Sequence, residues 1–137
     1  MTAKYDIEIN KSSNFDMWIQ YLTDGNTAIN LQSYDAELQI KKYKGAPYPL
    51  LFASERGITY GYTAGLNTGI AGIGGISLNT NYDGTGITGG IRISFDFEST
   101  DSLPFGKYFY DLKLIIGTTY SQKLLEGRVS VLDGVNL

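Results

Sequence analysis

The sequence predicts an all-β domain built as an antiparallel sandwich or barrel. Short segments in which apolar and polar residues alternate follow one another along most of the chain, as in residues 91–98, IRISFDFE. Gly, Asn, Asp and Pro separate these segments at intervals typical of turns between strands. No segment keeps the 3.6-residue period of an amphipathic helix. Two packed sheets would bury the apolar face of each strand and leave its charged face in water.

The N-terminal half predicts three strands, at residues 5–10, 15–22 and 34–42. Their inward positions are apolar or aromatic: Tyr5, Ile7, Ile9, Phe15, Met17, Ile19, Tyr21, Ala36, Leu38 and Ile40. By the same alternation, Trp18 falls on the polar face of the second strand. Pro47 and Pro49 exclude a regular central strand at that point, and a short apolar run follows at residues 50–52.

The C-terminal half predicts strands at residues 91–98, 107–116 and 121–132. The inward positions are Ile91, Ile93, Phe95, Phe97, Tyr108, Tyr110, Leu112, Leu114, Ile116, Leu125, Gly127, Val129 and Val131. Residues 99–103 have the composition of a single helical turn, which Pro104 ends.

Residues 57–90 differ from the sequence on both sides. They hold 11 of the chain's 17 glycines and only one of its charged residues, Asp83. We expect one domain over residues 1–137, with core strands in 1–54 and 91–137 and with 57–90 as an inserted arm or hairpin. The dipeptide Asp83-Gly84 has the composition of a hairpin tip.

Three interpretations of residues 57–90 are open. Glycines recur at every fourth position from Gly57 to Gly69, the spacing of a membrane helix dimer, but Asn, Thr and Gly make the segment too polar and too poor a helix former. A flexible linker would not need five isoleucines. An extended arm that becomes ordered against neighbouring subunits agrees best with the Ile, Tyr and Thr content, since these residues favour strand pairing.

The composition excludes several kinds of active site. The chain has 137 residues with no Cys and no His, so zinc sites of the common types, Ser-His-Asp and Cys-His catalysis and histidine general bases are ruled out. The formal charge of −3 argues against a nucleic-acid partner, and the densest basic run, at residues 41–44, is typical of a solvated strand end. The N-terminus lacks the pattern of a secretory signal, so we expect synthesis in a cytoplasm without export by a cleaved peptide.

Acidic residues give only weak candidate sites. The pairs Asp6 with Glu8 and Asp96 with Glu98 are neighbours on one strand face, whereas a glycosidase needs carboxylates that face each other across a cleft. Four residues supply oxygen ligands of the kind that calcium prefers: Asp96, Glu98, Asp101 and Ser102. A solvated strand end with a local helix cap explains them equally well. We therefore expect no catalytic residue, metal, cofactor or small-molecule substrate.

Three segments resemble a known family. They are residues 31–41, LQSYDAELQIK, residues 103–112, LPFGKYFYDL, and residues 124–131, LLEGRVSV. This pattern is similar to the immunoglobulin-like domains of tailed-bacteriophage structural proteins, such as the N-terminal module of baseplate upper proteins. The resemblance implies an immunoglobulin-like β-sandwich in the virion. Tyr108 then stands where a tyrosine corner would, with its hydroxyl bonded to upstream backbone.

The residues and the resemblance together predict a non-enzymatic structural component of a phage particle, made in the host cytoplasm and located in the tail, baseplate or head-to-tail connector. Its partners would be other virion proteins and copies of itself, without insertion into a membrane. The residues expected at the partner interface are Trp18, Tyr60, Tyr62, Ile70, Ile73, Ile76 and Tyr82. The alternatives are a capsid decoration protein and a receptor- or carbohydrate-binding module in which Trp18 and exposed tyrosines stack on sugars.

Overall fold

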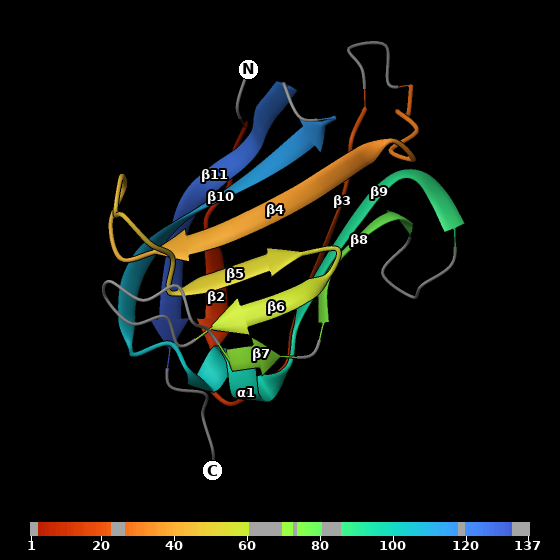
Figure 1. The fold of residues 1–137 in the computed structure, drawn as a ribbon. Coiled ribbons are helices and arrows are strands. Elements are labelled where there is room, and N and C mark those ends of the chain that lie inside the picture. The colour runs from red at the N-terminus through yellow and green to blue at the C-terminus, as the bar shows by residue number, and fades with distance from the viewer. Residues whose placement is uncertain are drawn as a thin grey trace.

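The computed structural model describes residues 3–22, 27–60, 70–72, 74–80, 86–117 and 120–132. Within these residues the chain forms eleven strands and one short helix (Figure 1). The first six strands are β1 (Ala3–Lys4), β2 (Ile7–Asn10), β3 (Phe15–Gln20), β4 (Tyr34–Lys41), β5 (Leu51–Ser54) and β6 (Gly57–Tyr60). The others are β7 (Ile70–Gly72), β8 (Gly74–Thr80), β9 (Gly86–Phe95), β10 (Gly106–Ile116) and β11 (Tyr120–Leu132), with α1 (Phe97–Asp101) between β9 and β10. The all-β prediction is confirmed.

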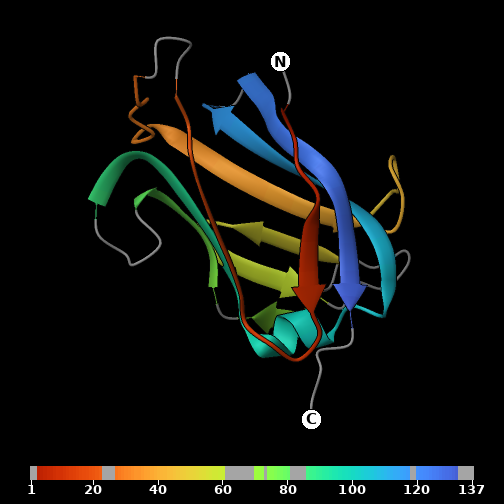
Figure 2. The same cartoon turned by 180° about the vertical axis from the view of Figure 1, so that it is seen from behind.

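The strands form two sheets. The large sheet has the order β1-β11-β10-β4-β5-β6-β7, and β2 also pairs with β11. The small sheet has the order β3-β9-β8. Neighbouring strands are antiparallel except at β11, where β1 and β2 pair in parallel. Seen from behind, β3 lies in front of the large sheet and β2 runs beside β11 (Figure 2).

The core lies between the inner faces of the two sheets. Its largest fully buried side chains are Phe95, Ile9, Leu31, Leu38, Ile40, Leu51, Ile91, Ile93, Leu103, Leu112, Leu114 and Val129. Phe15 of β3 stacks on Phe95 of β9, with ring centroids 5.3 Å apart. The predicted alternation is therefore confirmed for most inward positions, because period-2 patterning places every second side chain on the buried face.

Three inward predictions at strand ends are wrong. Ile116, the last residue of β10, is 37% exposed. Tyr5 is exposed, because regular pairing with β11 stops after Lys4 and resumes at Ile7. Phe97 is 54% exposed, because the strand ends at Phe95 and the chain turns into α1. Asp96 causes that change: its carboxylate caps the helix by accepting hydrogen bonds from the backbone N–H and the hydroxyl of Ser99.

The predicted separation of residues 57–90 from the core is also wrong for the part that the structure describes. Strand β6 continues the large sheet beside β5, and β8 pairs with β9 in the small sheet. Ile58, Tyr60 and Ile76 belong to the hydrophobic core. The pair Thr80 and Gly86 is the last described in the β8–β9 ladder, and Asp83-Gly84 lies outside the described residues.

The glycines of this region stand where backbones pass very close together. A Cβ atom on Gly75 would lie 2.5 Å from the carbonyl oxygen of Ser54, in the neighbouring sheet. A Cβ atom on Gly90 would overlap the carbonyl oxygen of Thr80 and touch the indole nitrogen of Trp18. Close contact between strands, and not flexibility, therefore explains these glycines.

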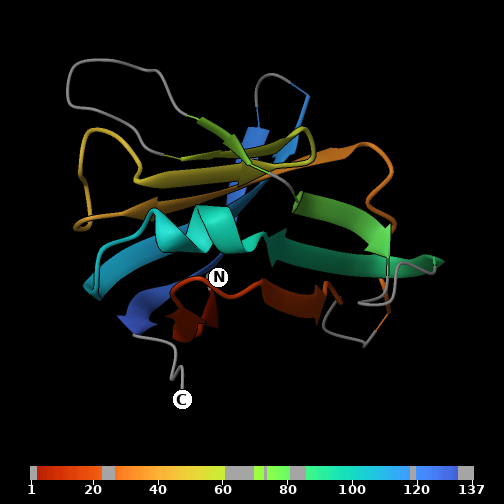
Figure 3. The same cartoon turned by 90° about the horizontal axis from the view of Figure 1, so that it is seen from below.

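Helix α1 closes one end of the domain (Figure 3). Its buried residue Thr100 donates a hydrogen bond to the carbonyl oxygen of Ser13, 2.8 Å away, which connects the helix to the β2–β3 turn. The chain then passes Pro104 and enters β10, where the Tyr108 hydroxyl donates to the Pro104 carbonyl oxygen at 2.7 Å. The predicted bond from Tyr108 to upstream backbone is confirmed.

Substitution of Gly90 tests whether β8 and β9 pack closely together. Gly90→Ala should lower the free energy of unfolding by about 1–3 kcal/mol, because the new methyl group forces β8 and β9 apart. Gly86→Ala, in the same strand, should change it by no more than about 0.5 kcal/mol, because a Cβ atom there meets nothing within 4 Å. Urea denaturation followed by circular dichroism measures both. Equal stabilities of the two variants would contradict the tight β8–β9 packing.

Candidate binding pocket on the large sheet

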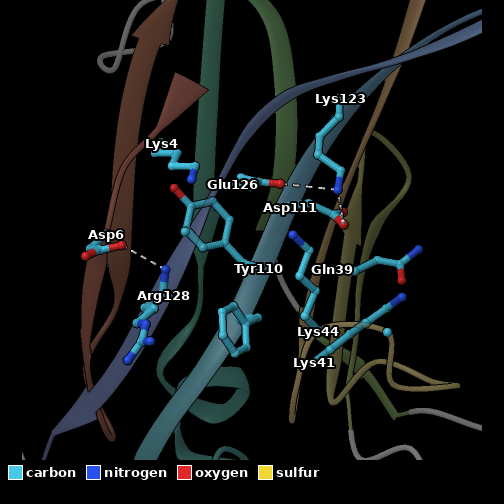
Figure 4. A pocket seen from close by; sticks show the side chains of 13 residues that line it. Lys4, Asp6, Gln39, Lys41, Lys44, Tyr110, Asp111, Lys123, Glu126 and Arg128 are labelled. Carbon is cyan, nitrogen blue, oxygen red and sulfur yellow. Dashed lines mark hydrogen bonds and ion pairs between the residues drawn. The ribbon is translucent and has the colours of Figure 1, made fainter. Parts of the chain in front are cut away.

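A pocket of about 490 Å³ lies on the outer face of the large sheet. Pockets that hold small ligands usually measure about 300–1,000 Å³. Five cationic side chains line it: Lys4, Lys41, Lys44, Lys123 and Arg128. Three carboxylates also line it: Asp6, Asp111 and Glu126. Figure 4 shows Lys4, Asp6 and Arg128 on one side of the pocket, with Gln39, Lys41 and Lys44 on the other.

Strand register brings these residues together from distant parts of the sequence. Asp111 of β10 is paired with Glu126 of β11 and with Gln39 of β4, so their side chains share one face. That face is opposite to the core, since their neighbours Leu112 and Leu38 are buried. The parallel pairing of β1 with β11 then places Lys4 beside Glu126.

The carboxylates of the pocket all have partners within the protein. The Lys123 ammonium lies 3.3 Å from Glu126 and 3.9 Å from Asp111. Asp6 accepts a hydrogen bond of 2.9 Å from the backbone N–H of Arg128. This bond replaces the ladder bond that is lost where β1 and β2 are interrupted. Each carboxylate therefore has a donor within the protein and retains lone pairs for further donors.

The other cationic side chains of the pocket have fewer partners within the protein. The ammonium groups of Lys4, Lys41 and Lys44 form no ion pair with any residue in the described part of the chain. The Arg128 guanidinium stands over the Phe109 ring, 5.6 Å from its centroid, which leaves its N–H groups able to donate. The pocket thus combines an aromatic side chain with several unpaired cationic donors.

Tyr110 of β10 also lines the pocket, although its side chain is almost fully buried. Its side chain is 3% exposed, and its hydroxyl donates to the carbonyl oxygen of Tyr5 at 2.5 Å. The Tyr5 carbonyl oxygen can lie here because the residue of β11 paired with Tyr110 is Gly127. A Cβ atom at Gly127 would overlap that oxygen. Burial, with smaller contributions from Asp6 and Tyr5, raises the pKa of the Tyr110 phenol well above its ordinary value.

The residues predicted for a partner interface do not meet at one described surface. Tyr60 and Ile76 are buried in the core, 8% and 3% exposed, so neither offers a side chain to a partner. Trp18 is half-buried on the outer face of the small sheet, and its indole N–H donates to the Thr80 carbonyl oxygen at 2.6 Å. Three predicted residues, Tyr62, Ile73 and Tyr82, lie outside the described residues, as does the side chain of Ile70.

Trp18 therefore owes part of its burial to its own chain. Its indole passes Gly90 of the adjacent strand to reach β8, a path that only a residue without a side chain leaves open. Its role in an interface stays a prediction.

The other candidate sites are less developed. Over the described ranges, no cluster of three or more Asp, Glu, His or Cys side chains is placed to hold a metal ion. Asp96 is used as the helix cap, and Asp101 accepts a hydrogen bond from the Ser12 hydroxyl at 2.7 Å. A second hollow of about 90 Å³ beside Glu55 is small for an organic ligand. Partial burial, followed by repulsion from Asp35, raises the pKa of the Glu55 carboxyl.

The pocket was not predicted from the sequence. Residues 41–44 stood out as the densest basic run, and alternation placed Gln39 and Lys41 on an outward face. The approach of Lys4 and Arg128 depends on the parallel pairing of the N-terminal strand with the last strand, which leaves no local pattern in the sequence.

The comparisons with known proteins give no family for this chain. No protein-family model matches it, and no match is found among curated proteins. In the described part of the chain, no helix is long and apolar enough to cross a membrane.

The buried phenol of Tyr110 predicts a loss of stability at alkaline pH. Its raised pKa means that the folded protein keeps this proton above pH 10, where the unfolded chain releases it. The stabilisation is therefore complete below about pH 10 and declines above it, by up to about 1.4 kcal/mol per pH unit for one such group. Urea denaturation at pH 8, 10 and 11 should show a shallower decline for Tyr110→Phe than for the parent. Tyr120→Phe, at an exposed tyrosine, should keep the parent slope.

Proposed function

We propose that this chain is a non-enzymatic structural component of a tailed-phage particle, which assembles through contacts between subunits. The observation that carries the proposal is the Tyr108 hydroxyl bonded to the Pro104 carbonyl oxygen. The contact lies inside residues 103–112, one of the three segments that resemble phage immunoglobulin-like domains. A tyrosine corner of this kind belongs to that class of sandwich.

The strand order supports the finer assignment to an immunoglobulin-like sandwich of the variable type. In such domains strands A, B, E and D form one sheet, and strands G, F, C, C′ and C″ form the other. The N-terminal strands of this chain, β1 and β2, pair instead with β11. Here β3, β9 and β8 have the order of B, E and D, and β11, β10, β4, β5 and β6 have the order of G, F, C, C′ and C″. Tyr108 then falls near the start of strand F, where a tyrosine corner is expected.

Under this assignment, the glycine-rich residues 57–90 supply strands C″, D and the start of E. The described residues of this range belong to the sandwich. We therefore look for the assembly contacts on other surfaces of the described chain.

The end of the domain at α1 is the best candidate for such a contact. Phe97 and Phe105 are 54% and 58% exposed, and Leu132 is also exposed. The Lys11 ammonium stands 5.2 Å from the centre of the Phe105 ring, and the Lys11 backbone N–H bonds to the Leu132 carbonyl oxygen. Aromatic residues are enriched at protein interfaces, and the two exposed rings are the feature of this surface that favours a partner. We name this surface, formed by Lys11, Phe97, Phe105 and Leu132, the α1 end.

The partner of the α1 end would be another virion protein or a second copy of this chain. The tail, baseplate and head-to-tail connector are the proposed sites, with decoration of the capsid as the alternative. The other alternative is a receptor- or carbohydrate-binding module. Trp18 is partly covered by its own chain, so the feature that supports this alternative is the pocket on the large sheet.

Replacing the aromatic residues of the α1 end tests the assembly role. The double variant Phe97→Ser/Phe105→Ser should reduce incorporation into phage particles at least about tenfold, since interface aromatic residues commonly contribute more than 1 kcal/mol each. Quantitative mass spectrometry of purified particles measures the incorporation. The melting temperature of the isolated chain should change little, because both rings are exposed.

Tyr120→Ser is the matched control, because Tyr120 is an exposed aromatic residue at the opposite end of β10 and β11. It should be incorporated like the parent. Absence of the parent chain from purified particles would overturn the proposed function, whereas normal incorporation of the double variant would overturn only the role of the α1 end.

A further inference from the structure

The pocket on the large sheet has more positive than negative side chains in a chain that is acidic as a whole. Five cations and three carboxylates line it, although the chain carries a formal charge of −3. Lys123 faces both Asp111 and Glu126, and Asp6 is bonded to the neutral backbone N–H of Arg128. The five cations and three carboxylates of the lining therefore sum to a formal charge of +2. A ligand that fits must therefore bring at least one negative charge.

The lining also contains groups that a simple anion would not use. Gln39 offers both a donor and an acceptor, and Asp111 and Glu126 offer acceptor oxygens beside Lys123. Phe109 offers a ring for apolar contact. Sulfate presents only acceptors, so it would leave the oxygens of Asp111 and Glu126 without a donor from the ligand. A ligand with hydroxyl donors, an apolar C–H face and a carboxylate matches all of these groups.

A sugar acid has that combination. Its carboxylate is an acceptor for the lysine ammonium groups, and its hydroxyls donate to carboxylate and amide oxygens. The C–H face of the ring packs on an aromatic side chain. The geometry points to a binding site for an acidic saccharide, such as a short uronic-acid oligosaccharide, on the outer face of the large sheet. This site is separate from the α1 end and does not depend on the proposed role in assembly.

Calorimetric titration of the full chain with an oligogalacturonate tests the proposal. We expect saturable binding that weakens as NaCl is raised from 50 to 500 mM, because screening reduces the attraction of the lysines. A neutral oligosaccharide of equal length should bind at least about tenfold more weakly. Sodium sulfate, a poly-glutamate peptide and single-stranded DNA complete the set of probes.

The variants locate the site. Lys41→Gln/Lys44→Gln should weaken oligogalacturonate binding about tenfold or more, through loss of charge-assisted hydrogen bonds. Lys42→Gln is the matched control, because Lys42 lies in the same segment, is exposed and does not line the pocket. Phe109→Leu should weaken the binding of the saccharide and leave any weak sulfate binding unchanged. Far-ultraviolet circular dichroism and the melting temperature establish that each variant is folded.

Three results would overturn the proposal. The first is the absence of oligogalacturonate binding by the folded parent chain. The second is binding that Lys41→Gln/Lys44→Gln and Lys42→Gln weaken equally. The third is equal or tighter binding of sulfate, poly-glutamate or single-stranded DNA, since each would assign the pocket to a different class of ligand.

Discussion

The arrangement of the large sheet depends on the close approach of the N-terminal strand to Gly127. At this point the Tyr5 carbonyl oxygen occupies the space that a side chain on β11 would fill, and Tyr110 donates its hydroxyl to the same oxygen. The Asp6 carboxylate accepts a hydrogen bond from the Arg128 N–H, which gives this backbone donor a partner where the strand pairing is interrupted. These contacts hold β1 and β2 along β11, cover the edge of the sheet and place Lys4 above the pocket.

Close approach of backbones also explains glycines of β8 and β9. Gly75 and Gly90 lie where a strand touches the backbone of a neighbour, and Asn79 connects the surrounding segments. The Asn79 side-chain oxygen accepts hydrogen bonds from the backbone N–H groups of Leu31 and Gly89, both at 3.0 Å. Few charges are needed in a region whose strands are fixed by backbone contact and by one satisfied amide. Low charge and high glycine content thus indicate tight packing here.

Much of the fold could be predicted from the sequence, because alternation depends only on which face of a strand is buried. Ile91, Ile93 and Phe95 are buried as the pattern indicates, and Tyr108 makes the backbone contact that its position in LPFGKYFYDL implies. The described residues of 57–90 were misassigned because the sequence does not distinguish a glycine at a close backbone contact, such as Gly75 or Gly90, from a glycine in an extended arm. The pocket could not be predicted, because parallel pairing of the first and last strands is a long-range feature without a local signal.

The distribution of charge also limits what the pocket can select. Since the pocket is positive and the chain has a formal charge of −3, the surface outside the pocket carries more negative charge than the total suggests. A long polyanion such as nucleic acid would be repelled wherever it extends beyond the lysines. A short ligand with one charge on each sugar ring places its carboxylates on the lysines and its neutral atoms elsewhere. The acidity of the chain and the basicity of its pocket therefore act together to favour short anionic ligands over long polyanions.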